Sequence, residues 1–120
     1  MALLERKNVD FSHVDSRGEL HQLVHEGYEQ VNVLFTRAGV ERGGHYHKRA
    51  VECFFVISGA VEVTAWLGDE RECERYGKGD FFRINPPAVH SMSFTEDCTM
   101  VAMYDKAVEN PDGTKDIYPG

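Results

Sequence analysis

The histidine pair at positions 45 and 47 is the feature of this sequence with the clearest chemical meaning. Side chains two residues apart on an extended strand point to the same side, so both imidazoles would face one point. Glu52 follows five residues after His47, and a lone histidine, His90, stands in a later strand-like segment. Three imidazoles and one carboxylate are a sufficient ligand set for a divalent transition metal. We therefore predict that His45, His47, Glu52 and His90 bind one such ion.

This prediction depends on the combination of residues, because any one histidine taken alone is more typical of the surface or of a hydrogen-bonded core position. The ligand set suits Zn, Fe, Mn, Ni or Co and does not select among them. A bound ion with open coordination positions would polarise a carbonyl or hydroxyl group of a small-molecule ligand.

Short strands are the elements that must position these side chains. Apolar and polar residues alternate over 31–36 and 61–67, and glycine- or proline-containing turns separate further short apolar runs. Glu52 has the opposite strand parity to His47, so a bend or bulge within 48–51 must bring it round. Many short strands at close intervals, without a convincing long helix, predict an all-β sandwich or a small jelly-roll barrel.

The size and charge of the chain limit the class of protein to which it can belong. Its 120 residues provide for one domain, which we divide into a core at about 31–104, an N-terminal hairpin at 9–25 and a polar tail at 105–120. A formal net charge of −7 argues against nucleic acid or an anionic membrane as a partner, because phosphate binding needs a basic face. The N-terminus lacks the order of a signal peptide, and no apolar run approaches the ~20 residues of a membrane span, so we expect a cytoplasmic protein.

The spacing around the histidine pair resembles the first motif of the cupin superfamily. The motif's fixed positions are all matched, by Gly39, His45, His47, Glu52 and Gly59. The resemblance implies a cupin-type double-stranded β-helix, which is a jelly-roll barrel.

The second cupin motif is matched in part. Gly79 and His90 keep its separation, whereas Asn85, Pro87 and Phe94 replace its proline, inner glycine and asparagine. These departures affect the turn that precedes His90, and so the position of the fourth proposed ligand.

A narrower resemblance concerns the substrate. Segment 42–48, RGGHYHK, is similar to a signature of cupins that act on nucleotide-linked sugars. These are the dTDP-4-keto-6-deoxyhexose 3,4-ketoisomerases and the cupin domain of bifunctional capsular-polysaccharide precursor enzymes. Glutamine tends to replace Glu52 in the ketoisomerases, so Glu52 agrees with the metal-binding capsular type. The resemblance implies a sugar isomerase or epimerase in surface-polysaccharide or deoxysugar biosynthesis.

Proton transfer would need a side chain other than the metal-bound histidines. In metal-free sugar isomerases of this kind, paired histidines are thought to move a proton between adjacent carbons through an enediol. A histidine bound to a metal cannot also be that base. We therefore expect Tyr104 or Glu52 to be catalytic, and we rank Tyr46 last because its parity turns it away from its histidine neighbours.

Binding of a nucleotide sugar would also need cations at its pyrophosphate. An acidic protein must place its few cationic side chains together at one opening of the binding site for such a ligand. We expect this role for Arg37, Arg42, Lys48 and Arg83. The alternative for Arg37 and Arg83 is an ordinary solvated position on a strand.

Two other functions stay open. A metal-dependent dioxygenase of the three-histidine, one-glutamate kind would need a redox metal and O₂, and a non-catalytic module would only bind a small molecule. Small one-domain cupins commonly dimerise through their N-terminal strands, so the resemblance also implies a homodimer in which the 9–25 hairpin packs on the partner.

Overall fold

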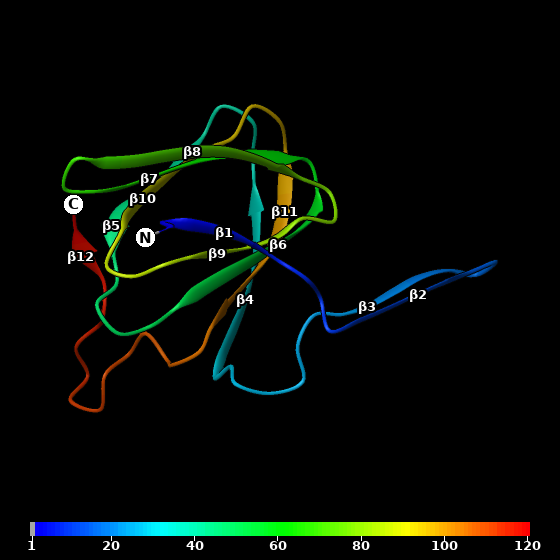
Figure 1. Ribbon diagram of the computed structural model, residues 1–120, viewed down its shortest axis with the longest axis horizontal. Coiled ribbons are helices and arrows are strands. Elements are labelled where there is room, and N and C mark those ends of the chain that lie inside the picture. The colour runs from blue at the N-terminus through cyan, green and yellow to red at the C-terminus, as the bar shows by residue number, and fades with distance from the viewer. Residues whose placement is uncertain (1) are drawn as a thin grey trace.

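Two antiparallel five-stranded sheets form the body of the protein, as the computed structural model of residues 2–120 shows (Figure 1). The first sheet has the strand order β1-β9-β6-β11-β4, and the second has the order β12-β5-β10-β7-β8. All twelve elements in residues 2–120 are strands, which confirms the all-β prediction: β1 (Leu4–Lys7), β2 (Phe11–Asp15), β3 (Gly18–Gln22), β4 (Gln30–Thr36), β5 (Glu41–Tyr46), β6 (Glu52–Ser58), β7 (Ala60–Leu67), β8 (Glu70–Gly77), β9 (Phe81–Ile84), β10 (Val89–Ser93), β11 (Cys98–Tyr104) and β12 (Tyr118–Pro119). Across residues 2–120 we find no helix of the length and apolar character that a bilayer crossing requires.

Alternating apolar side chains build the core between the two sheets. Phe54, Phe82 and Met100 from the first sheet and Val63 and Met92 from the second are all at most 4% exposed. Successive strand residues point to opposite faces, so only every second side chain of each strand enters this space. The parity of a residue therefore decides whether it can reach a site between the sheets.

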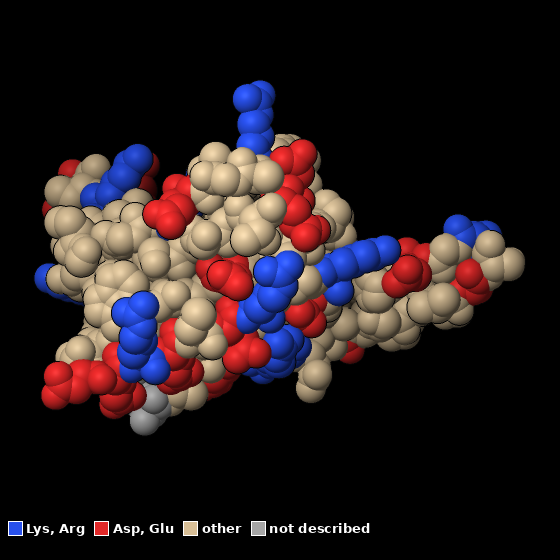
Figure 2. All heavy atoms as spheres, turned by 90° about the horizontal axis from the view of Figure 1, so that it is seen from above, with Lys and Arg blue, Asp and Glu red and all other residues tan. Residues whose placement is uncertain are grey.

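The outer face of the first sheet carries a second apolar cluster, built on Cys53, Phe81 and Met103. The segments on either side of the β2–β3 hairpin cover this cluster with Val9, Leu23, Val24 and Tyr28. The hairpin itself is the one expected at 9–25, and it extends away from the body as an arm (Figures 1 and 2). Figure 2, which views the molecule from above Figure 1, shows acidic and basic side chains interspersed on the face turned to the viewer.

Three strands were not foreseen by the pattern of the sequence. β1 pairs with β9, β12 pairs with β5, and β8 is an edge strand whose charged residues face solvent. The C-terminal tail, expected only as a polar segment, has Asp116 buried at 2% exposure. This tail lies against the strand that carries the histidine pair.

Candidate metal and catalytic site

Strands from both sheets converge on the histidine cluster. His45 lies on β5 and pairs directly with His90 of β10 in the second sheet. Glu52 begins β6 and pairs with Tyr104 at the end of β11 in the first sheet. His47 follows the end of β5, and the chain then crosses to the first sheet before Glu52. The bend expected in 48–51 is therefore a crossing between sheets, not a bulge within one strand.

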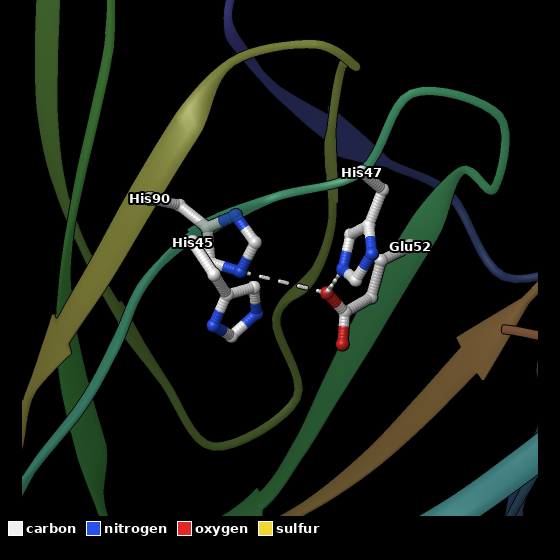
Figure 3. Close-up of side chains that lie close together, drawn as sticks. All are labelled: His45, His47, Glu52 and His90. Carbon is white, nitrogen blue, oxygen red and sulfur yellow. Dashed lines mark hydrogen bonds and ion pairs between the residues drawn. The ribbon is translucent and has the colours of Figure 1, made fainter. Parts of the chain in front are cut away.

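The four side chains come close enough to share an ion. One ligand atom from each of His45, His47, Glu52 and His90 lies within 4.8 Å of the others (Figure 3). Glu52 Oε1 is 3.2 Å from His47 Nε2 and 3.6 Å from His90 Nε2. His47, Glu52 and His90 are at most 5% exposed, whereas His45 is partly exposed. A small molecule would therefore reach the cluster from the side of His45.

Gly43 permits the close approach of β5 and β10 that pairs His45 with His90. Its φ of 108° lies in the region that favours glycine, and a Cβ placed there would lie 2.6 Å from the carbonyl oxygen of His90. The register of the two strands shifts at this point, between His90 and Ser91. A glycine is thus needed where the backbone of one ligand strand touches the other.

We expect Gly43→Ala to destabilise the fold by roughly 2–4 kcal/mol, because it adds a backbone clash to an unfavourable φ. Gly44→Ala is the matched control, since Gly44 has a φ of 71° but open space where its Cβ would lie. Gly44→Ala should lower the free energy of unfolding by only about 1 kcal/mol, because of its backbone conformation alone. Urea unfolding of both variants measures the difference. Equal losses would show that the close approach at Gly43 does not limit the strand pairing.

His47 has its two ring nitrogens in different surroundings. Nδ1 lies 2.6 Å from the backbone carbonyl oxygen of Asp116, so Nδ1 must carry a hydrogen and donate it. Nε2 then faces the Glu52 carboxylate, a contact that is favourable only with a second proton or a cation on Nε2. Burial lowers the pKa of His47, but the hydrogen bonds with Glu52 and the Asp116 carbonyl raise it above the ordinary value overall.

The other two imidazoles are biased towards the neutral form. Burial lowers the pKa of His90 to about 4, although the Glu52 charge opposes this change. Burial also lowers the pKa of His45, again against the attraction of Glu52. The cluster therefore offers neutral imidazole nitrogens at neutral pH, the form that binds metals and accepts protons.

Tyr104 borders the cluster from the first sheet. Its ring lies 5.7 Å from that of His47, edge to face. Burial, followed by the negative charge of Glu52, raises the pKa of Tyr104 far above the ordinary value. The phenol is therefore neutral at physiological pH and can donate a proton. Tyr46 instead packs against Tyr118, as its parity predicted.

The four cationic side chains expected at a pyrophosphate do not lie together at one opening of the site. Arg83 alternates with the inward-facing Phe82, so it lies on the outer face of the first sheet, where it pairs with Glu5 at 2.6 Å. Arg42 donates to Thr36 at the end of β4. Arg37 follows Thr36, whose partner on β11 is Cys98. Cys98 lies six residues from Tyr104, or about 20 Å along the strand.

Lys48 is the exception among these cations, because it directly follows His47 in the chain. Its Nζ lies 4.3 Å from the centre of the Tyr118 ring. Tyr118 packs against Tyr46, so Lys48 is close to the cluster in the chain while its ammonium group lies against this aromatic pair. The substrate-binding roles of all four cations stay predictions.

The residues of the cluster fit a divalent metal. Within residues 2–120, His90 Nδ1 is buried and has no hydrogen-bond partner, and Nε2 of the same ring is too far from Glu52 for a strong hydrogen bond. Burying an imidazole without hydrogen bonds costs free energy. A cation among the three imidazoles and the carboxylate would supply a partner to Nε2, the ring nitrogen that faces Glu52, although not to Nδ1.

Comparison with known families gives one match. Residues 13–112 match the family described as "Polysaccharide biosynthesis C-terminal domain". No curated protein matches the chain. The matched segment includes all four residues of the cluster and Tyr104 but ends before Asp116.

Solved structures share the fold at low sequence identity. TDP-quinovose 3,4-ketoisomerase from Campylobacter jejuni superposes with a TM-score of 0.84 at 16% identity, covering 100% of this chain and 95% of that one. A sugar 3,4-ketoisomerase from Thermoanaerobacterium thermosaccharolyticum, solved with TDP, gives 0.76 at 18% identity and coverages of 92% and 90%. dTDP-4-dehydrorhamnose 3,5-epimerase from Sulfolobus tokodaii gives 0.72 at 18% identity and coverages of 93% and 80%. These likenesses confirm the cupin-type jelly-roll fold.

Proposed function

The chain belongs to the family of the polysaccharide biosynthesis C-terminal domain, and from this premise we propose that it is a metal-binding isomerase or epimerase of a nucleotide-linked keto-sugar. One observation carries the proposal: three imidazoles, a carboxylate and a neutral phenol meet between the sheets of a cupin barrel. The similar structures named above as ketoisomerases and as an epimerase support the reaction class. Their ligands, TDP and TDP-4-keto-6-deoxyglucose, support the substrate class.

His45, His47, Glu52 and His90 would hold the ion. This donor set suits Zn, Fe, Mn, Ni or Co. When bound, the ion supplies Lewis-acid polarisation of a carbonyl oxygen. Burial of this set between the sheets excludes water from three of the four side chains.

In an isomerisation, a proton leaves the carbon beside the sugar carbonyl and a proton arrives at the former carbonyl carbon, while the hydroxyl proton moves from one oxygen to the other. In an epimerisation, the proton returns to the same carbon from the opposite face. No electrons enter or leave, because the enediol redistributes them within the sugar. Tyr104 borders the cluster and its phenol is protonated at physiological pH, so we assign proton donation to its phenol oxygen. Glu52, held by His47, is the carboxylate available to accept one.

The test incubates the protein, loaded separately with each of these metals, with TDP-4-keto-6-deoxyglucose in D₂O. We expect a new keto-sugar isomer or epimer by NMR, with deuterium at the exchanged carbon. Oxygen consumption with the iron-loaded protein would favour a dioxygenase instead. Binding of the sugar nucleotide without conversion would favour a non-catalytic binding module.

We also propose that two copies of the chain form a homodimer. Val31, Val33 and Phe35 of the edge strand β4 are exposed on the outer face, with Phe35 76% exposed. The projecting hairpin also carries exposed apolar side chains among its polar ones, with Val14 67% exposed. These side chains match the exposed apolar residues of the unpaired edge strand, so each arm would lie along the partner's β4.

Sedimentation velocity should therefore report about twice the 13.6 kDa of the chain. Phe35→Asp should shift the protein towards the monomer, because it buries a charge in the interface. Val40→Asp changes another exposed valine outside this face and serves as the control. A monomeric wild-type protein at micromolar concentration would contradict the proposal.

A further inference from the structure

The C-terminal tail forms a strap over the strand of the histidine pair. In β12, Tyr118 pairs with Tyr46 and Pro119 pairs with His45. The amide of Gly120 then donates to the carbonyl of Gly44 at 3.0 Å. The strap thus covers the edge of β5 along the part of the strand that carries the first proposed ligand.

Asp116 anchors the strap to the crossing between the sheets. Its carboxylate is almost fully buried and accepts three backbone hydrogen bonds, from the amides of Lys48 at 3.0 Å, Arg49 at 2.9 Å and Ala50 at 2.8 Å. A carboxylate that accepts several backbone N–H groups can stay ionised while buried. These amides belong to the loop that separates His47 from Glu52, so one side chain holds the first three residues of the crossing. The amide of Val51, the fourth residue, donates to Asp105 at 2.8 Å.

The same residue also contacts the ring of His47. The backbone carbonyl of Asp116 accepts the hydrogen of His47 Nδ1. In metal sites, a ligand histidine commonly donates its second ring nitrogen to a carbonyl or carboxylate, which fixes the tautomer and the ring orientation. Here that hydrogen bond leaves Nε2 as the nitrogen that faces Glu52.

We propose that Asp116 is the positioning residue of this site: its carbonyl fixes the tautomer of His47, and its carboxylate holds the 48–50 loop so that His47 and Glu52 meet. The metal-dependent part of this inference rests on the proposed function. The structural part does not, because the tautomer of His47 can be observed in the metal-free protein. Asp116 lies beyond the segment that matches the family, so family membership did not assign it.

The test compares Asp116→Asn with Asp112→Asn, which removes the same charge from an exposed site in the same tail. The carboxylate of Asp112 accepts hydrogen bonds from the amide and the hydroxyl of Thr114. Cobalt(II) titration with a competing chelator measures affinity, and the cobalt absorption bands report the ligand geometry. We expect Asp116→Asn to weaken Co²⁺ binding about 10–100-fold and to change the bands, as for other residues that support metal ligands. Asp112→Asn should bind as the wild type does.

The metal-free proteins are compared by ¹⁵N NMR of the histidine rings. At a pH where the ring has lost its second proton, wild-type His47 should show a single tautomer protonated at Nδ1, and Asp116→Asn should show a mixture. Asp116→Glu keeps the charge on a longer side chain, and it is used instead if Asp116→Asn does not fold. It should show the same changes in tautomer and affinity, but smaller ones. A folded variant with wild-type His47 signals and affinity within twofold would overturn the proposal. Failure of the wild type to bind Co²⁺ would count against the proposed function alone, because the ring signals still decide the role of Asp116.

Discussion

Glu52→Gln is expected to lower the affinity for a divalent metal at least ~100-fold while the protein stays folded. Glu52 is the only carboxylate of the four-residue cluster, so its replacement removes the one anionic ligand. Loss of a direct ligand should exceed the roughly 10–100-fold effect of losing a residue that supports a ligand. Glutamine has nearly the same shape, so the packing between β6 and the core should remain.

The histidine beside Glu52 supplies a second readout. Burial lowers the pKa of His47, and the hydrogen bond with Glu52 is the largest of the effects that raise it. Metal binding requires a free Nε2, so protons compete with the metal and affinity falls as the pH drops below this pKa. Without the carboxylate, the pKa of His47 should fall. The decline in metal affinity should therefore begin at a lower pH in Glu52→Gln.

The measurement is metal content by elemental analysis after purification without chelator, followed by titration from pH 5 to 8. Glu62→Gln makes the same chemical change on the solvent-facing side of β7 and is the control. The thermal unfolding of metal-free Glu52→Gln tells whether a loss of binding reflects misfolding. Unchanged metal content in a folded Glu52→Gln protein would exclude Glu52 as a ligand.

The histidine pair shows how much of the site the sequence could predict. His45, His47 and Glu52 are close in the chain, so their types and spacing were enough to indicate one cluster. His90 lies far along the chain, yet it pairs directly with His45 because β10 is the neighbour of β5. The glycines before His45 suggested a tight turn, but Gly43 and Gly44 lie within strand β5, where Gly43 contacts the backbone of His90.

Other parts of the site depend on tertiary contacts that leave no local pattern. Asp116 looks like one more acid in a polar tail, and only the return of that tail to β5 buries it. Arg83 looked able to reach a pyrophosphate, but its parity beside Phe82 puts it on the outer face. The charged strand β8 lacks an apolar alternation because Tyr76 is its one buried residue. Sequence spacing therefore predicted the four-residue cluster better than it predicted the residues that support it.

Tyr104→Phe is expected to lower kcat for the keto-sugar about 10²–10⁴-fold with little change in KM. A positioned proton donor typically contributes this range. The ring of Tyr104 packs edge to face on His47, and phenylalanine preserves that contact. Burial and the Glu52 charge keep the phenol protonated across the physiological range, so the hydroxyl can act as a donor throughout.

Tyr28→Phe is the matched control, because Tyr28 lies on the opposite face of the same sheet and its hydroxyl contacts Cys53. That variant should keep the wild-type kcat, and both variants should keep the wild-type metal content. Steady-state kinetics then separates a chemical role of Tyr104 from a packing role, since packing defects would alter metal binding and stability as well. A kcat within threefold of the wild type would leave Glu52 as the proton-transfer group. Because Glu52 is also a proposed ligand, one of its carboxylate oxygens would then have to move both protons while the other binds the metal.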